Sequence, residues 1–216
     1  MITEQKRGVL STVRTVVGGV ALAALFAVGA ERAIAQTEDA DDALYADSYV
    51  GAASDDLFVG VMIADHPPEP DRKAVIVYLC DGEEVSTWLF GEAIGDSVVV
   101  ADGDTQVELS LGDTGVAGVL ERAGEAPRLV VLEPAMGDAG LYRSVQSIGG
   151  DDYVGGWIVL NDGRQRGAIT LGGEVVDNPT LDPVSGQAES TVGTFGTNCF
   201  RDPRTGDRIC RYWHLN

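Results

Sequence analysis

Cys80 is the residue best suited by type to nucleophilic chemistry, and it ends the apolar run 75–80 just before an Asp-Gly turn. A nucleophilic thiolate needs an accessible, electropositive setting and a base nearby. Three carboxylates follow Cys80 within four positions, and they would raise its pKa. The two histidines, His66 and His214, lie in a Pro-rich stretch and near the end of the sequence. We therefore expect Cys80 to be a buried strand residue, with an intermolecular disulfide or a reactive thiol as the alternatives.

Asp113 is the candidate for acid-base hydrolysis. The stretch LGDTGVAG contains Asp113-Thr114-Gly115, and with the later SIGGDDYVGG it resembles the catalytic loop and flap of retroviral-type aspartic peptidases. That resemblance implies a pair of aspartates that share one proton, one from each subunit of a dimer. Gly112 precedes Asp113, however, where the family has an apolar strand, so the stretch also reads as an ordinary tight turn. An aspartic peptidase-like hydrolase using Asp113 is thus the alternative to a non-enzymatic protein.

Metal and cofactor sites are not expected. Zinc requires clustered histidine and cysteine ligands, and this sequence has two histidines and three cysteines far apart. Asp102 and Asp104 share a turn, but the pattern of a calcium-binding EF-hand loop is absent, so we interpret this turn as a solvated hairpin tip. No Gly-x-Ser-x-Gly elbow and no phosphate-binding Gly-x-x-x-x-Gly-Lys loop occurs.

The elements that would position these residues are β-strands. In DTQVELSL, Thr105, Val107, Leu109 and Leu111 alternate with polar residues, as in a half-buried strand. Similar runs occupy 57–64, 73–80, 85–91, 97–101, 115–122 and 127–133. Asp-Gly turns between them favour hairpins that pair neighbours antiparallel. The fold class predicted is all-β, a small antiparallel meander that closes into a β-barrel, with a two-layer β-sandwich as the alternative.

The C-terminal part is predicted to be less regular. A hairpin is expected over 157–171, bending at Asn161-Asp162-Gly163, so the antiparallel β domain spans 49–171. Residues 172–216 are rich in turn formers and should form an irregular segment. Within it, Cys199 and Cys210 bracket a loop with Pro and Gly, a spacing that predicts a disulfide hairpin in an exported protein.

The N-terminal part has the pattern of an export signal. Three basic residues precede the uncharged apolar run 15–30, and Ala33-Ile34-Ala35 offers a cleavage site. We expect a signal peptide over 1–35, an acidic flexible linker over 36–48 and a secreted or extracytoplasmic protein. A retained N-terminal membrane anchor is the alternative, although the run is shorter than the roughly twenty residues that span a bilayer.

The charge of the chain limits its partners. The formal net charge is −19, and removal of residues 1–35 leaves 11 basic and 32 acidic residues, a net charge of −21. Such a surface repels nucleic acid and anionic membranes, and its self-repulsion favours a monomer. Partners should be cationic or uncharged.

The function predicted is binding: a secreted non-enzymatic β domain, or a cell-envelope accessory protein, for an unknown protein or an apolar small ligand. If the barrel has a cavity, Tyr78, Trp88 and Phe90 are candidates to line it. A locally basic, aromatic cluster near the C-terminus is the candidate for partner binding. Its members are Arg201, Arg204, Arg208, Arg211, Tyr212 and Trp213.

A broader similarity covers roughly residues 49 to 171. It rests on LFVGVMI, YLCDG, Trp88, the alternating strands, AGLYR and WIVLNDGRQRGA in that order. Together they resemble a β-rich domain of uncharacterised exported proteins from high-GC bacteria. The resemblance implies one β domain with Cys80 at a strand end, and it implies no activity.

Overall fold

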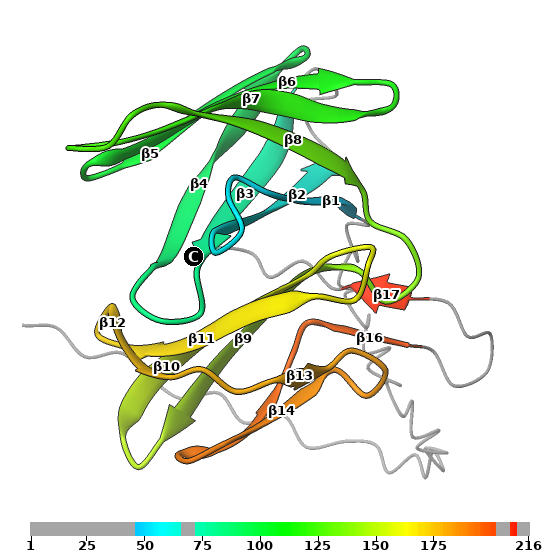
Figure 1. Cartoon of the computed structure of the whole chain (residues 1–216). Helices are drawn as coiled ribbons and strands as arrows, with labels where there is room; N and C mark the ends of the chain where they lie inside the picture. The colour runs from blue at the N-terminus through cyan, green and yellow to red at the C-terminus, as the bar shows by residue number, and fades with distance from the viewer. Residues whose placement is uncertain (1–45, 66–71, 202–207, 211–216) are drawn as a thin grey trace, which may run out of the picture. The chain divides into compact units, whose positions relative to one another are not determined.

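The computed structural model describes residues 46–65, 72–201 and 208–210 (Figure 1). This part of the chain forms 17 β-strands and contains no helix. Accordingly, none of its segments is a helix of the length and apolar character needed to cross a bilayer. The all-β class predicted from the sequence is confirmed.

A closed antiparallel barrel of eight strands in sequence order is the main element, so the barrel rather than the sandwich is correct. Every strand pairs with its neighbour along the chain. The strands are β1 (Ala46–Ala52), β2 (Phe58–Asp65), β3 (Arg72–Cys80), β4 (Ser86–Ile94), β5 (Ser97–Asp102), β6 (Thr105–Gly112), β7 (Gly115–Arg122) and β8 (Arg128–Pro134).

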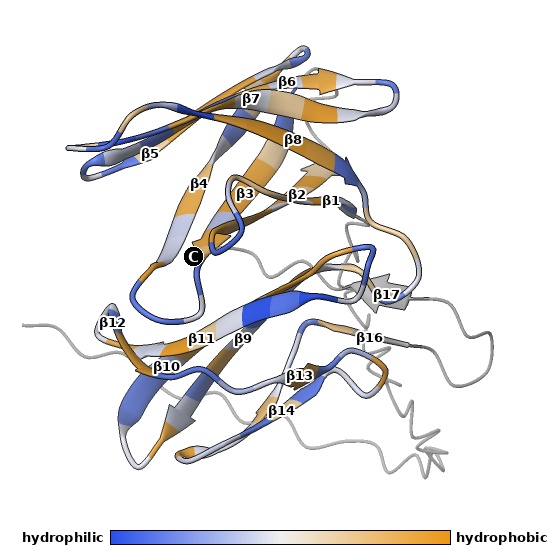
Figure 2. Ribbon diagram, in the orientation of Figure 1, coloured by the Kyte–Doolittle hydropathy of each residue, from blue (hydrophilic) through white to orange (hydrophobic). Residues whose placement is uncertain are grey.

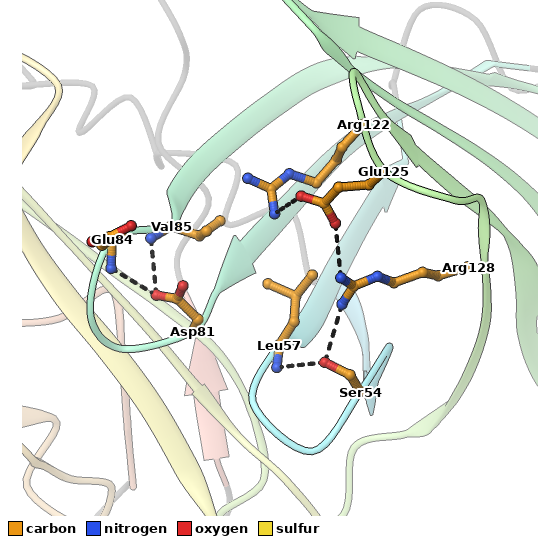
Figure 3. Close-up of polar contacts among 8 residues, drawn as sticks. All are labelled: Ser54, Leu57, Asp81, Glu84, Val85, Arg122, Glu125 and Arg128. Carbon is orange, nitrogen blue, oxygen red and sulfur yellow. Dashed lines mark hydrogen bonds and ion pairs between the residues drawn. The ribbon is translucent and has the colours of Figure 1, made fainter.

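Tight turns explain this order. Gly95 and Gly103 have φ values of 59° and 54°, the left-handed region that two-residue hairpin turns require. At another hairpin end, Arg128 donates to the hydroxyl of Ser54 and pairs with Glu125, which also pairs with Arg122 (Figure 3). These contacts link the turn after β7 to the loop after β1.

The barrel interior is filled by aliphatic side chains. Alternate strand residues point inward, and the cluster they form contains no aromatic residue among its buried members. Figure 2 shows hydrophobic residues recurring along the barrel strands. On β6, Val107 and Leu109 are buried and Glu108 is exposed, as the alternation predicts. Aliphatic side chains fill the interior. The ring of Tyr78 does not line it and packs in a second hydrophobic core.

Two strand pairings of the barrel are short. β4 pairs with β5 only through Ala93–Val98 and Ile94–Ser97. β1 pairs with β8 only through Tyr49–Pro134 and Val50–Glu133. The barrel therefore consists of two four-stranded halves, β1–β4 and β5–β8, that join at two narrow seams.

A separate four-stranded sheet in the order β12-β11-β10-β9 contacts the outer surface of β1–β4. Its strands are β9 (Gly140–Ile148), β10 (Asp151–Val159), β11 (Gln165–Leu171) and β12 (Glu174–Asp177). The second core lies between the two layers and includes Tyr78, Trp157 and Ile158. Gly60 makes room for Leu141 and Ile158, since an added Cβ there would lie 3.2–3.3 Å from their side chains. The predicted hairpin over 157–171 is thus present, but it lies outside the barrel sheet.

The segment after residue 171 is more regular than predicted. It contains β12, a three-stranded sheet of β13 (Leu181–Asp182), β14 (Gln187–Ser190) and β15 (Gly193–Gly196), and the hairpin of β16 (Cys199–Arg201) and β17 (Arg208–Cys210). Short strands thus recur through the described part of the segment that was expected to be irregular. Cys199 and Cys210 lie directly opposite each other in that hairpin.

Candidate functional site

A polar cleft of about 640 Å³ lies between the β3–β4 loop, β11 and the chain after β12. Ligand pockets commonly have volumes of about 300–1,000 Å³, so the cleft has room for a small molecule. Its lining residues are Asp56, Asp81, Gly82, Glu83, Gln165, Arg166, Gly167, Asn178, Pro179 and Thr180.

Asp81 fixes the loop that forms one wall. Its Oδ1 accepts hydrogen bonds from the amides of Glu83, Glu84 and Val85 at 2.8–2.9 Å, and Figure 3 shows the last two. An aspartate that bonds the amides ahead of it stabilises a turn without other help. The side chain of Asn178 reaches across and donates to the carbonyl of Gly82 at 2.6 Å. The Asp81 bonds therefore fix one wall of the cleft, and the Asn178–Gly82 bond links it to the other.

Arg166 supplies the cationic group of the cleft. Its guanidinium lies 5.1 Å from the ring centroid of Phe58, and Nη1 donates to the carbonyl of Gln165 at 3.3 Å. Gly82, at a φ of 82°, lets the stem of Arg166 pass close by, because a Cβ there would lie 3.0 Å from Cδ. In the part of the chain that the structure describes, Nε and Nη2 of Arg166 make no hydrogen bond.

Three carboxylates share the cleft with Arg166, yet none of them forms an ion pair with it within the described ranges. Asp56 and Glu83 are exposed, and the Oδ1 of Asp81 is occupied by backbone amides. Arg164 provides a contrast on the same aromatic ring. It lies 5.5 Å from the Phe58 centroid but is paired with Asp162 at 2.8 Å and lines a different pocket. The cleft therefore presents one cation and three anionic side chains to a ligand.

Cys80 lies at the end of β3 with no exposed surface, and its thiol is free. Burial raises its pKa, against a smaller lowering by a hydrogen bond from Tyr78. Burial also raises the pKa of Tyr78, whose hydroxyl is 2.9 Å from that of Ser86. A thiol in this state is a poor nucleophile. These observations agree with the expectation of a strand-end core residue.

The predicted ligand-lining aromatics lie outside the barrel interior. Tyr78 stacks on Trp88 with ring centroids 4.1 Å apart, and Trp88 stacks on Phe90 at 6.4 Å. The guanidinium of Arg143 lies 5.2 Å from the Trp88 ring and 5.9 Å from the Phe90 ring. Only Phe90 among the three is well exposed, at 40%. The structure thus brings them together on the outer face, and their role in ligand binding remains a prediction.

The other predicted residues are dispersed. Asp113 lies in the exposed turn between β6 and β7. Its role in an aspartic peptidase-like hydrolase remains a hypothesis. Arg201 and Arg208 are opposite each other in the β16–β17 hairpin. The remaining members of the C-terminal cluster, Arg204, Arg211, Tyr212 and Trp213, lie outside the described residues, as do His66 and His214.

Metal-ligating side chains do not gather in the described ranges, where no group of three or more His, Cys, Asp or Glu could hold an ion. Asp102 and Asp104 flank the Gly103 turn as expected. Sequence reasoning missed Arg166, because the cleft joins segments more than eighty positions apart. The available signal was two arginines in NDGRQRGA within a strongly acidic chain.

The fold defines an all-β protein built on a closed eight-stranded barrel with an outer sheet. No protein-family model matches the chain, and neither the curated proteins nor the solved structures include a significant match. The resemblance to exported β-rich domains is therefore not supported by these comparisons.

Proposed function

We propose that this is an exported, non-enzymatic binding protein, or an accessory protein of the cell envelope, whose cleft takes a small amine-bearing carboxylate. The observation that carries the proposal is the guanidinium of Arg166, which lines a cleft of about 640 Å³ without an ion-pair partner among the described residues. An arginine fork is suited to bidentate hydrogen bonds with a carboxylate.

The carboxylates of the cleft set the rest of the ligand. Asp56, Asp81 and Glu83 outnumber Arg166 by three to one, so a simple anion would be repelled. Ammonium groups on the same molecule would offset that repulsion. The favoured class is a compound with one carboxylate and one or two ammonium groups, such as a basic amino acid or short peptide. Such a compound is neutral with one ammonium group and cationic with two, in line with the cationic or uncharged partners expected from the overall charge.

Export is part of the proposal and rests on the signal-like residues 1–35. The β16–β17 register supports the accompanying disulfide between Cys199 and Cys210. Opposed residues in an antiparallel pair have Cα separations of about 4.5–5.5 Å, within the range that a disulfide bridges. The measurement is the intact mass of the exported protein together with a count of its free thiols. A mass that corresponds to a chain beginning at Gln36, with one free thiol, would agree with both the cleaved signal peptide and the disulfide.

The test of the cleft uses calorimetric titration with the dipeptide lysyl-alanine and with its C-terminal amide. We expect Arg166→Gln to weaken binding of the dipeptide about tenfold, the effect of losing one charge-assisted hydrogen bond of roughly 1.5 kcal/mol. The same variant should not weaken binding of the amide, because the amide has no carboxylate for Arg166 to bind and its two ammonium groups lose a repelling charge.

Arg164→Gln is the matched control, because Arg164 contacts the same Phe58 ring but lines another pocket. It should bind both compounds as the unmodified protein does. Equal loss of affinity in the two arginine variants would show a structural effect on Phe58. Failure of the unmodified protein to bind the dipeptide would contradict the proposed ligand class.

A further inference from the structure

One edge of β4 lacks a strand partner in the described part of the chain. β4 pairs along its whole length with β3, whereas its pairing with β5 ends at Ala93–Val98. Gly91 still lies close to β5, because a Cβ there would fall 2.6 Å from a methyl group of Val100. The open stretch is therefore Ser86–Phe90, and Figure 1 shows this part of β4 diverging from β5.

Two turns fix the backbone groups that face this edge. The amide of Asp81 donates to the carbonyl of Val85, so this opposed pair is hydrogen-bonded. Going from this pair into the β3–β4 ladder, opposed pairs alternate between those without hydrogen bonds to each other, beginning with Cys80–Ser86, and those with them. By this count Thr87 and Leu89 bond to β3. The two-residue turn at Gly95-Asp96 makes Ile94–Ser97 a bonded pair on the β5 side.

The backbone groups of every second β4 residue before Ile94 point to the same side as those of Ile94, the side of β5, and Phe90 is one of these residues. The alternation that starts at the Asp81–Val85 pair assigns Phe90 to the same side. The N–H and C=O groups of Ser86, Trp88 and Phe90 thus point away from β3, toward the open edge. This parity also makes Tyr78–Trp88 a closely spaced unbonded pair, which agrees with the stacking of their rings at 4.1 Å.

The open stretch itself contains no lysine, proline or bulge. Natural edge strands are commonly blunted by lysine, proline or a bulge, but Ser86–Phe90 reads STWLF and keeps its register with β3. Exposed apolar side chains lie beside it. They are Phe90 at 40%, Ile94 at 69% and Val99 at 59% exposed.

Charge indicates what kind of chain would pair there. Acidic residues lie at both ends, Glu84 in the preceding loop and Glu92 after the open stretch, where it pairs with Arg72. Arg143 also lies at this stretch, with its guanidinium over the Trp88 and Phe90 rings. A second copy of a chain with net charge −19 would be repelled, whereas a basic segment would be attracted.

We infer that the Ser86–Phe90 edge of β4 is a docking site for an extended, lysine- or arginine-rich segment of a partner protein, which adds to the barrel as a strand. Main-chain hydrogen bonds to Ser86, Trp88 and Phe90 supply the pairing, and side chains on one face of the added strand contact Phe90.

The test uses the full protein and a fluorescent peptide of alternating lysine and valine, seven residues long. We expect it to bind and to protect the amides of Ser86, Trp88 and Phe90 from hydrogen exchange, whereas Thr87 and Leu89 are protected with or without it. The same sequence with every amide N-methylated keeps its charge but cannot pair, and should not bind. A glutamate-valine peptide should not bind either.

Phe90→Pro removes an outward N–H without removing a bond to β3, and should weaken peptide binding by more than about tenfold. Phe90→Ala, which keeps the N–H, should lose less. Equal binding of the N-methylated peptide would overturn the inference, as would edge amides already protected without peptide. Self-association sensitive to Phe90→Pro would assign the edge to a second copy instead.

Discussion

The Asp177 carboxylate accepts four hydrogen bonds, and they connect the end of β12 to the sheet that contains β14. At the end of β12, its Oδ2 accepts from the hydroxyls of Ser190 and Thr191 and from the Thr191 amide, at 2.7–2.8 Å. Oδ1 accepts from the amide of Asn178. These donors lower the pKa of Asp177 from 3.8 to about 2, led by the Thr191 amide.

Stability follows from that shift with a definite sign. The folded pKa is below the unfolded one, so the ionised carboxylate stabilises the fold fully above pH 3.8, and this contribution is lost as pH falls through about 2. We expect Asp177→Asn to unfold more easily at pH 7 by about 1 kcal/mol after allowing for solvent screening, or roughly 2–4 °C in Tm.

Thermal denaturation between pH 2 and 7 checks this expectation. The difference between Asp177→Asn and the unmodified protein should shrink toward pH 2. Asp151→Asn, at an exposed position of β10, is the matched control and should show little difference at any pH. A difference that does not change with pH would refute the role of the ionised carboxylate.

At the scale of elements, glycines set how closely the outer sheet approaches the barrel. Gly156 on β10 faces the Tyr78 and Trp88 rings, and a Cβ there would lie 2.5 and 2.6 Å from their nearest atoms. The hydroxyl of Tyr78 also donates to the carbonyl of Gly156 at 3.4 Å. A methyl group at this position would force the two layers apart.

We therefore expect Gly156→Ala to destabilise the protein by about 1–3 kcal/mol, the usual cost of overpacking a core. Urea denaturation measures this change. Gly196→Ala is the control, since an added Cβ at Gly196 meets no atom within 4 Å. Similar stability of both variants would mean that the layers are not in close contact at Gly156.

The sequence predicted the elements whose side chains alternate clearly. β6 and its neighbours were recognisable because each strand buries one face and exposes the other. β1 was not predicted as a strand, and the β domain was expected to begin only at Tyr49. Ala46, Asp47 and Ser48 have little β preference and pair with β2 in the structure.

Elements and sites that depend on distant contacts were not predictable. β13 has only two residues, and its turn is held by Asp182, which accepts from Val184 and Ser185. The cleft requires the Asp81 loop and Arg166 to meet, and no local pattern encodes such a meeting. The burial of Tyr78 and most of Trp88 outside the barrel was hidden for the same reason.

At the scale of the whole molecule, charge opposes compaction. A net charge of −19 places many carboxylates on the surface, and few of the described ones are paired. Raising NaCl from about 0.01 M to 1 M shortens the Debye length from about 30 Å to 3 Å. We expect Tm to rise, by roughly 2–4 °C for each 1 kcal/mol of repulsion removed. Scanning calorimetry in NaCl and KCl should give equal rises, and a constant or falling Tm would contradict the expectation.

The narrow seams of the barrel give its wall two points of easy separation. Parting β1 from β8 breaks only two opposed pairs and leaves a continuous eight-stranded ribbon with all other pairings intact. Parting β4 from β5 likewise breaks two opposed pairs, and the two halves then remain paired to each other through β1 and β8. We therefore expect water to reach the aliphatic interior along these two lines first, and amide exchange to be faster at the seams than within the sheets.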